Sequence, residues 1–209
     1  MPCLETLGVH AGREDFGELG VHAAPLDLST TYPVRDLAEG TTSFDALVGG
    51  AATAANPIYA RLHNPTVARF ENALAQLEGT TDAVAFGSGM AAMSACLLAA
   101  GQRGKHVLAV RPLYGTNDHL LNSGLLGIAT RWVEPKDVAG AINADTALVI
   151  IETPANPTLD LIDIAAVVKA AGSVPVLVDS TFATPVLQQP AALGATLVFD
   201  SATKFLAGQ

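Results

Sequence analysis

Several residue types are scarce in this sequence, and each scarcity excludes a class of protein. Only two of the 209 residues are cysteine, Cys3 and Cys96, too few for a disulfide framework or a cysteine-ligated zinc site. Lys and Arg number 11 against 20 Asp and Glu, and the net charge of −9 argues against nucleic acid or an anionic membrane as a general partner. No apolar stretch is long enough to span a bilayer, and residues 1–12 lack the pattern of a secretory signal. We therefore expect a protein of the reducing cytoplasm.

The sequence is rich in apolar residues instead. Half of its residues are hydrophobic and only 15% are charged, so the chain is not expected to be disordered. A chain of this size can bury roughly 70% of its unfolded surface, which is enough for one core with a small appendage. Cys96 lies in an apolar run and is expected to be a small buried hydrophobic residue.

The first 58 residues show no clear hydrophobic period. Residues 41–56 are rich in Gly, Ala and Thr, which predicts a mobile loop. We therefore interpret 1–58 as an N-terminal arm or extension and 59–209 as the main domain.

From residue 64 onward the pattern becomes regular. Pro65 suits the first turn of a helix, and Gly79 suits its end. Between them apolar residues recur at helical spacing: Val67, Phe70, Leu74 and Leu77.

Short apolar runs without alternation follow, and they are typical of strands buried on both faces of a sheet. The predicted strands are 83–86, 106–110, 129–133, 147–151, 176–178 and 197–199. The predicted helices or helical turns are 90–100, 115–125, 164–171 and 190–193. This alternation indicates an α/β fold with a mainly parallel sheet. Because Gln209 comes soon after a strand and a Lys-containing turn, we expect the C-terminal part of the fold to be missing.

In open α/β sheets ligands bind beyond the carboxyl ends of the strands, so residues that follow strands are the candidates for chemistry. Residues 87–90, Gly-Ser-Gly-Met, lead into a helix, where small residues and free N–H groups suit an anion. Tyr114, Asn156, Asp179 and Lys204 each follow a predicted strand. Taken singly, each feature has a plainer interpretation as a tight turn, a packed tyrosine, a rigid loop, a cap or a surface lysine.

Taken together, these residues favour binding of pyridoxal 5′-phosphate (PLP). That cofactor needs a lysine for its Schiff base, an acid for the pyridinium nitrogen and an anion site for its phosphate. Lys204, Asp179 and residues 87–90 meet these needs on one sheet. No metal site is predicted.

The order of the motifs resembles the Cys/Met-metabolism family of PLP enzymes over nearly the whole chain. This family includes cystathionine γ-synthase, cystathionine γ-lyase, methionine γ-lyase and homoserine-ester sulfhydrylases. The motifs are Tyr59-Ala60-Arg61, Asn64-Pro65-Thr66, Ser88-Gly89-Met90, Tyr114-Gly115, Glu152-Thr153-Pro154, Asn156-Pro157-Thr158, Val178-Asp179-Ser180-Thr181-Phe182-Ala183, Leu187-Gln188-Gln189-Pro190 and Ser201-Ala202-Thr203-Lys204. The resemblance implies the large domain of an aspartate-aminotransferase-like, fold type I enzyme, and a homotetramer whose dimers share active sites.

The resemblance also implies catalytic roles. Lys204 would form the internal aldimine and move protons, Asp179 would pair with the pyridinium nitrogen, and Tyr114 would stack on the ring and serve in proton transfer. The other implied cofactor contacts are Ser88, Gly89, Met90, Ser201 and Thr203 at the phosphate, Tyr59 and Arg61 at the phosphate of a neighbouring subunit, Asn156 near O3′, and Thr181 beside the cofactor.

Some positions depart from the family pattern. Ser180 stands where Asn is usual, Thr116 follows Gly115 where many members have a second Gly, and Gln209 stands where His is common. The family also continues beyond this point, into a domain expected to bind the substrate carboxylate.

Three functions remain to be weighed. The first is PLP-dependent γ-elimination or γ-replacement on a sulfur-containing or homoserine-derived amino acid, and the sequence does not decide between the two reactions. The second is a truncated, non-enzymatic fragment that binds PLP or another subunit. The third, a nicotinamide-binding Rossmann protein, lacks the full G-x-G-x-x-G spacing and gives Lys204 no task.

Overall fold

The computed structural model describes residues 3–208, which group into two compact units. The first unit comprises residues 3–77 and 81–85, and the second comprises 78–80 and 86–208. The departure noted at Gln209 lies outside the described residues.

The second unit is built on a five-stranded sheet whose strands all run parallel, in the order β2-β1-β3-β4-β5. The strands are β1 (His106–Val110), β2 (Ala129–Val133), β3 (Thr146–Glu152), β4 (Val176–Asp179) and β5 (Leu197–Phe199). Every residue of β3 and β4 is buried, as expected of strands covered on both faces. The predicted α/β fold with a parallel sheet is confirmed.

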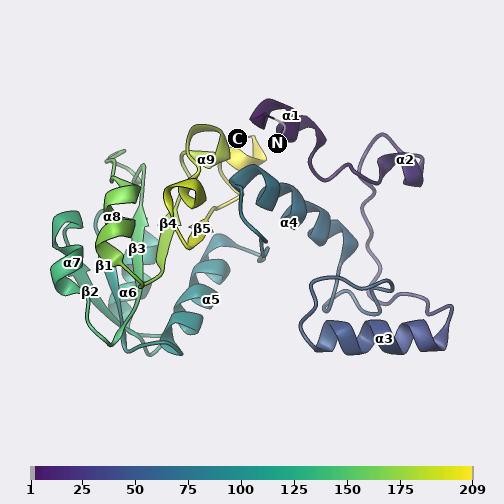
Figure 1. Ribbon diagram of the computed structural model, residues 1–209, viewed down its shortest axis with the longest axis horizontal. Coiled ribbons are helices and arrows are strands. Elements are labelled where there is room, and N and C mark those ends of the chain that lie inside the picture. Colours follow the sequence, from purple (N-terminus) through teal and green to yellow (C-terminus); the bar gives the residue numbers. More distant parts are fainter. Residues whose placement is uncertain (1–2, 209) are drawn as a thin grey trace. The chain divides into compact units, whose positions relative to one another are not determined.

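Helices cover both faces of this sheet (Figure 1). On one face, α5 (Gly89–Gly101) and α6 (Gly115–Ser123) contribute to a core cluster that includes Met93, Leu97 and Leu121. On the other face, α7 (Val138–Ala141) and α8 (Ile164–Ala171) contribute to a second cluster that includes Val138, Ile164 and Val167. The remaining helical turns of this unit are η1 (Pro135–Asp137), α9 (Thr184–Leu187), η2 (Pro190–Leu193) and η3 (Phe205–Ala207).

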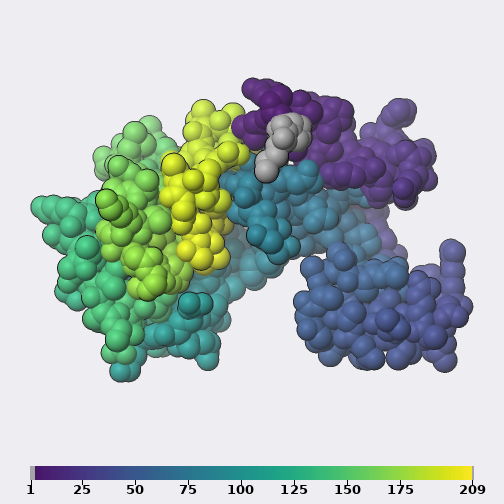
Figure 2. All heavy atoms as spheres, in the orientation of Figure 1, coloured from purple at the N-terminus to yellow at the C-terminus, as the bar shows by residue number. Residues whose placement is uncertain are grey.

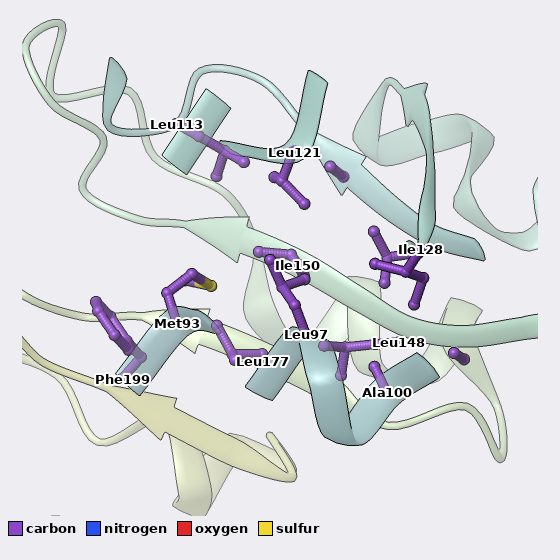
Figure 3. Close-up of a cluster of buried hydrophobic side chains, with 13 residues drawn as sticks. Met93, Leu97, Ala100, Leu113, Leu121, Ile128, Leu148, Ile150, Leu177 and Phe199 are labelled. Atoms are coloured by element: carbon purple, nitrogen blue, oxygen red, sulfur yellow. The ribbon is translucent and has the colours of Figure 1, made fainter. Parts of the chain in front are cut away.

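Helix α5 supplies the centre of the first cluster, as Figure 3 shows. Met93, Leu97 and Ala100 follow one another at helical spacing on its buried face and pack with strand residues such as Leu148 and Ile150. Cys96 lies on the same helix, partly buried against this cluster, in agreement with its expected role as a small hydrophobic residue.

Five predicted strands and the helices between them lie where the sequence places them, within one or two residues at their ends. The predicted strand at 83–86 is wrong, because no neighbouring strand of the described chain pairs with it. The Ala85 N–H donates to the Glu71 carboxylate at 2.7 Å instead, and Val84 is 71% exposed. An apolar run becomes a strand only when another strand accepts its hydrogen bonds.

The first unit contains four helices: α1 (Leu4–His10), α2 (Phe16–Leu19), α3 (Leu37–Val48) and α4 (Pro65–Glu78), whose last residue belongs to the second unit. Helix α4 is the one predicted from Pro65 onward. Asn64 caps it, since its Oδ1 accepts from the N–H groups of Thr66 and Val67.

The mobile loop predicted at 41–56 is wrong for its first half, which lies in α3. Asp36 caps this helix by accepting from the Glu39 N–H at 2.8 Å. The buried positions are Gly40, Ser43 and Leu47, which have helical spacing. Because two of these three residues are small, the hydrophobic pattern does not reveal the helix.

Within the first unit, residues before position 58 form hydrogen bonds with residues after it. Thr31 and Tyr59 form an antiparallel bridge, and Asp15 accepts two hydrogen bonds from Arg69, at 2.6 and 2.8 Å. The division into an arm of residues 1–58 and a main domain therefore stays a prediction. Within residues 3–208, no helix is both long and apolar enough to cross a membrane.

Leu97→Ala is expected to lower the free energy of unfolding by about 2–5 kcal/mol, because it leaves a cavity in the first core cluster. Leu98→Ala is the matched control on the same helix, since Leu98 is 53% exposed, and we expect a loss below about 1 kcal/mol. Urea denaturation of both variants measures the difference. Equal losses would contradict the proposed core.

Candidate active site

The carboxyl ends of four parallel strands meet at one edge of the sheet in the second unit, and a pocket of about 140 Å³ lies there. The residues that line it follow β1, β3, β4 and β5 or begin α5. They are Ser88, Gly89, Met90, Tyr114, Asn117, Glu152, Asn156, Asp179, Thr181, Phe182, Phe199, Ser201 and Lys204.

The N-terminus of α5 forms one wall of this pocket. Ser88 caps the helix by accepting from the Ala91 N–H at 3.1 Å. A Cβ atom at Gly89 would lie 3.3 Å from the Phe199 ring and 3.5 Å from the Ser201 Cβ, so the start of α5 packs closely against the residues that end and follow β5. Free N–H groups at a helix start, beside a hydroxyl, suit a phosphate.

Asp179 ends β4 at the base of the pocket and is 3% exposed. Its carboxylate accepts from the Thr181 N–H at 3.1 Å and from the Asn117 side-chain amide at 3.4 Å. Burial raises its pKa to about 6, although the hydrogen bonds from Thr181 act in the opposite direction. No Lys or Arg among residues 3–208 forms an ion pair with it. A cationic ring nitrogen would stabilise this buried carboxylate.

Lys204 is connected to Asp179 through a short series of hydrogen bonds. Thr181 Oγ1 accepts from the Ser201 N–H at 2.9 Å, and the Ser201 carbonyl accepts from the Lys204 N–H at 3.0 Å. Lys204 is exposed and lines the pocket. Figure 2 shows the C-terminal residues, in yellow, at the surface of the second unit.

Nine of the twelve predicted site residues line this pocket: Ser88, Gly89, Met90, Tyr114, Asn156, Asp179, Thr181, Ser201 and Lys204. Thr203 is exposed and does not line it. Tyr59 and Arg61 belong to the first unit, where the Arg61 guanidinium lies 5.0 Å from the centre of the Tyr59 ring. The chemical role of each of the twelve stays a prediction.

Sequence analysis assigned no role to Asn117 or Glu152, which also line the pocket. Asn117 is one helical turn beyond Tyr114, and its Oδ1 is buried without a hydrogen-bond partner in the described chain. Glu152 ends the buried strand β3 as Asp179 ends β4, and the two residues are partners in the strand register. An acid at the end of a buried strand is a signal that could have identified Glu152.

The buried Glu78 is paired with Asp200, a half-buried acid that directly follows β5. Glu78 is 3% exposed, and neither of its carboxyl oxygens has a donor among the residues described. Burial, followed by the charge of Asp200, raises the pKa of Glu78 to about 8. Burial also raises the pKa of Asp200 to about 6. Two adjacent buried acids are stable when one of them keeps its proton.

No cluster of three or more His, Cys, Asp or Glu residues that could hold a metal occurs between residues 3 and 208.

Comparison with known proteins identifies the family. The model for "Cys/Met metabolism PLP-dependent enzyme" matches residues 5–209. The chain belongs to this family. The sequence-based recognition is thereby confirmed, and the cofactor of the family is PLP.

Individual relatives agree with this assignment. L-methionine gamma-lyase of Streptomyces avermitilis is 59% identical over 98% of this chain and 50% of its own length. O-succinylhomoserine sulfhydrylase of Pseudomonas aeruginosa is 37% identical over 98% of this chain and 51% of its own length. The crystal structure of metB from Corynebacterium glutamicum superposes with a TM-score of 0.86 at 31% identity, covering 100% of this chain and 53% of that one. The chain spans about half the length of the relatives it matches.

The pocket residues fit PLP. The start of α5 and the Ser201 hydroxyl lie at one pocket, the buried Asp179 carboxylate lacks a cationic partner in the described chain, and Lys204 lines the same pocket. An anion site, an acid and an amine are the three groups that the cofactor requires.

Glu78→Gln is expected to weaken the pH dependence of stability. Because the folded chain holds a proton on Glu78 up to about pH 8, against an ordinary pKa of 4.5, folding stability falls as pH rises from about 4.5 to about 8. Glutamine does not ionise, so the variant should lose less stability over this range. Urea denaturation of the apo-protein at several pH values measures the slope, with the exposed Glu134→Gln as control. A wild-type slope in Glu78→Gln would contradict the raised pKa.

Proposed function

We propose that the full-length protein carrying this chain catalyses PLP-dependent γ-elimination on a sulfur-containing amino acid of the L-methionine type. The observation that carries the proposal is the presence of Lys204, Asp179 and the α5 N-terminus in one pocket. The 59% identity to an L-methionine gamma-lyase favours elimination and this class of substrate. Loss of the thiol from Cγ and release of the amino group, with consumption of one water, would give a thiol, ammonia and a 2-oxo acid.

Each pocket residue has a task in this proposal. Bound PLP supplies an electron sink for the negative charge that develops on the substrate Cα. Lys204 holds the cofactor through Nζ and, once released, moves the Cα proton. Asp179 keeps the proton on the pyridinium nitrogen, and its burial strengthens that ion pair.

The remaining residues bind the cofactor and orient it. Ser88, Gly89, Met90 and Ser201 hold the phosphate. Tyr114, which is 40% exposed and lines the pocket, stacks on the cofactor ring and takes part in proton transfer at the substrate. Asn156 and Thr181 contact the ring from the loops after β3 and β4.

The second candidate is γ-replacement, in which a thiol takes the place of the leaving group of a homoserine ester. The 37% identity to an O-succinylhomoserine sulfhydrylase supports it. Product analysis separates the two reactions, since elimination releases ammonia and a 2-oxo acid whereas replacement releases neither.

We also propose that the protein is a homo-oligomer, a tetramer built from dimers, in which Tyr59 and Arg61 reach the cofactor phosphate of a neighbouring subunit. Both residues belong to the first unit, whereas the pocket is lined by residues of the second. Large apolar side chains are highly exposed in the same unit, among them Leu26 at 76%, Leu28 at 89% and Leu37 at 82%. Exposed apolar surface of this kind marks an interaction site.

Lys204→Ala is expected to abolish turnover and the covalent link to PLP. Borohydride reduction followed by intact and peptide mass measurement should place a pyridoxyl group on Lys204 in the wild-type protein and none in the variant. Lys136→Ala is the matched control, since Lys136 is exposed and lies outside the pocket. Wild-type turnover in Lys204→Ala would refute the enzymatic assignment. A folded wild-type protein without an adduct would favour a non-enzymatic fragment or scaffold.

The shared site predicts complementation between two inactive variants. Arg61→Ala and Lys204→Ala subunits, expressed together, should regain about a quarter of wild-type activity, because one site of each mixed dimer then combines an intact Lys204 with an intact Arg61. Mixing Lys204→Ala with Asp179→Ala is the control, since both residues lie in one pocket and no intact site can form. Absence of recovery in the first mixture, with mixed oligomers shown by tagged co-purification, would contradict the shared site.

A further inference from the structure

Glu152 is the last residue of β3 and is 4% exposed. Both oxygens of its side chain accept hydrogen bonds from backbone N–H groups. Oε1 accepts from Asn156 at 2.8 Å, and Oε2 accepts from Tyr114 in a short hydrogen bond. One carboxylate therefore joins the loop after β1 to the loop after β3.

Each of these two loops carries a side chain that lines the pocket, Tyr114 and Asn156, and neither side chain is held by a hydrogen bond of its own within residues 3–208. Tyr114 is 40% exposed, and its side chain forms no capping hydrogen bond with α6. The Asn156 side chain forms no hydrogen bond within residues 3–208. The orientation of both side chains therefore depends on how their backbones are held.

A carboxylate is the side chain suited to this task. It offers acceptors on both oxygens, whereas glutamine has one acceptor and would turn its NH₂ group toward the other N–H. The N-terminus of α6 at Tyr114 adds favourable partial positive charge. The charged form of Glu152 is nevertheless unfavourable at this position, because burial and the charge of Asp179 raise its pKa to about 7. Glu152 thus combines an unfavourable burial of its carboxylate with hydrogen bonds to two loops of the pocket. This combination indicates that the residue positions those loops.

We propose that Glu152 is a positioning residue that fixes Tyr114 and Asn156 at the cofactor ring by holding both loops with one carboxylate. This inference rests on the proposed function, because it takes the two side chains as cofactor contacts. Glu152 itself acts through the loops and takes no part in proton transfer.

Glu152→Gln in the full-length protein tests the proposal. We expect the dissociation constant for PLP to rise about tenfold or more, because a charged double acceptor is replaced by a single neutral one. We also expect the visible circular dichroism of bound PLP to change, since it reports the orientation of the ring. Glu134→Gln is the control: Glu134 follows β2 but is exposed, and neither measurement should change.

Glu152→Asp separates positioning from general stability. It keeps the charge but is one methylene shorter, so it should reach only one of the two loops and give a dissociation constant between those of the wild type and Glu152→Gln. If Glu152→Gln does not fold, the Asp variant alone decides, with weakened PLP binding at an unchanged unfolding midpoint as the expected result.

Wild-type PLP affinity and dichroism in Glu152→Gln would overturn the proposal. Where only Glu152→Asp folds, the same result in that variant would overturn it. An equal loss of PLP affinity in the two variants would overturn it as well. Borohydride labelling of wild-type Lys204 distinguishes this failure from failure of the proposed function. If Lys204 is labelled in the wild type and substitution of Glu152 changes neither PLP affinity nor dichroism, only the positioning role is refuted. An unlabelled wild-type protein refutes the proposed function.

Discussion

Burial of the parallel sheet on both faces is the constraint on which the rest of the second unit depends. Helices α5 and α6 cover one face and α7 and α8 the other, so the central strands carry apolar side chains in both directions. Parallel strands also bring all their carboxyl ends to one edge. The polar residues that end or follow β1, β3, β4 and β5 therefore meet in one pocket without being close in sequence.

The same burial gives the site its electrostatic character. Asp179, Glu152 and Asp200 all lie at the ends of strands, and removal from water raises the pKa of each carboxyl group. Buried acids of this kind destabilise the apo-protein and are stabilised by a positive partner. The site thus gains from a cationic cofactor ring. Asp179 and Glu152 accept hydrogen bonds from backbone N–H groups and the Asn117 amide, and within residues 3–208 neither forms an ion pair with lysine or arginine.

The sequence predicted the elements that have a strong local signal. Continuous apolar runs identify the five strands, and Pro65, helical spacing and Gly79 identify α4. The sequence-based predictions failed where an element depends on contacts with residues far away in the sequence. Residues 83–86 have the composition of a strand but no strand beside them, and α3 buries Gly40 and Ser43, which leave no hydrophobic period. Asn117 was missed because nothing local shows that its amide faces a carboxylate 62 residues away.

The sequence by itself determined the fold class and the family, and it predicted residues for PLP, because strand composition and the order of motifs are local properties of the chain. Only the tertiary structure decided which of those residues share a pocket, that Glu152 joins two of its loops, and that the buried Glu78 is paired with the half-buried Asp200. These facts depend on distance and on exclusion of water, which arise only when strands far apart in sequence pack side by side.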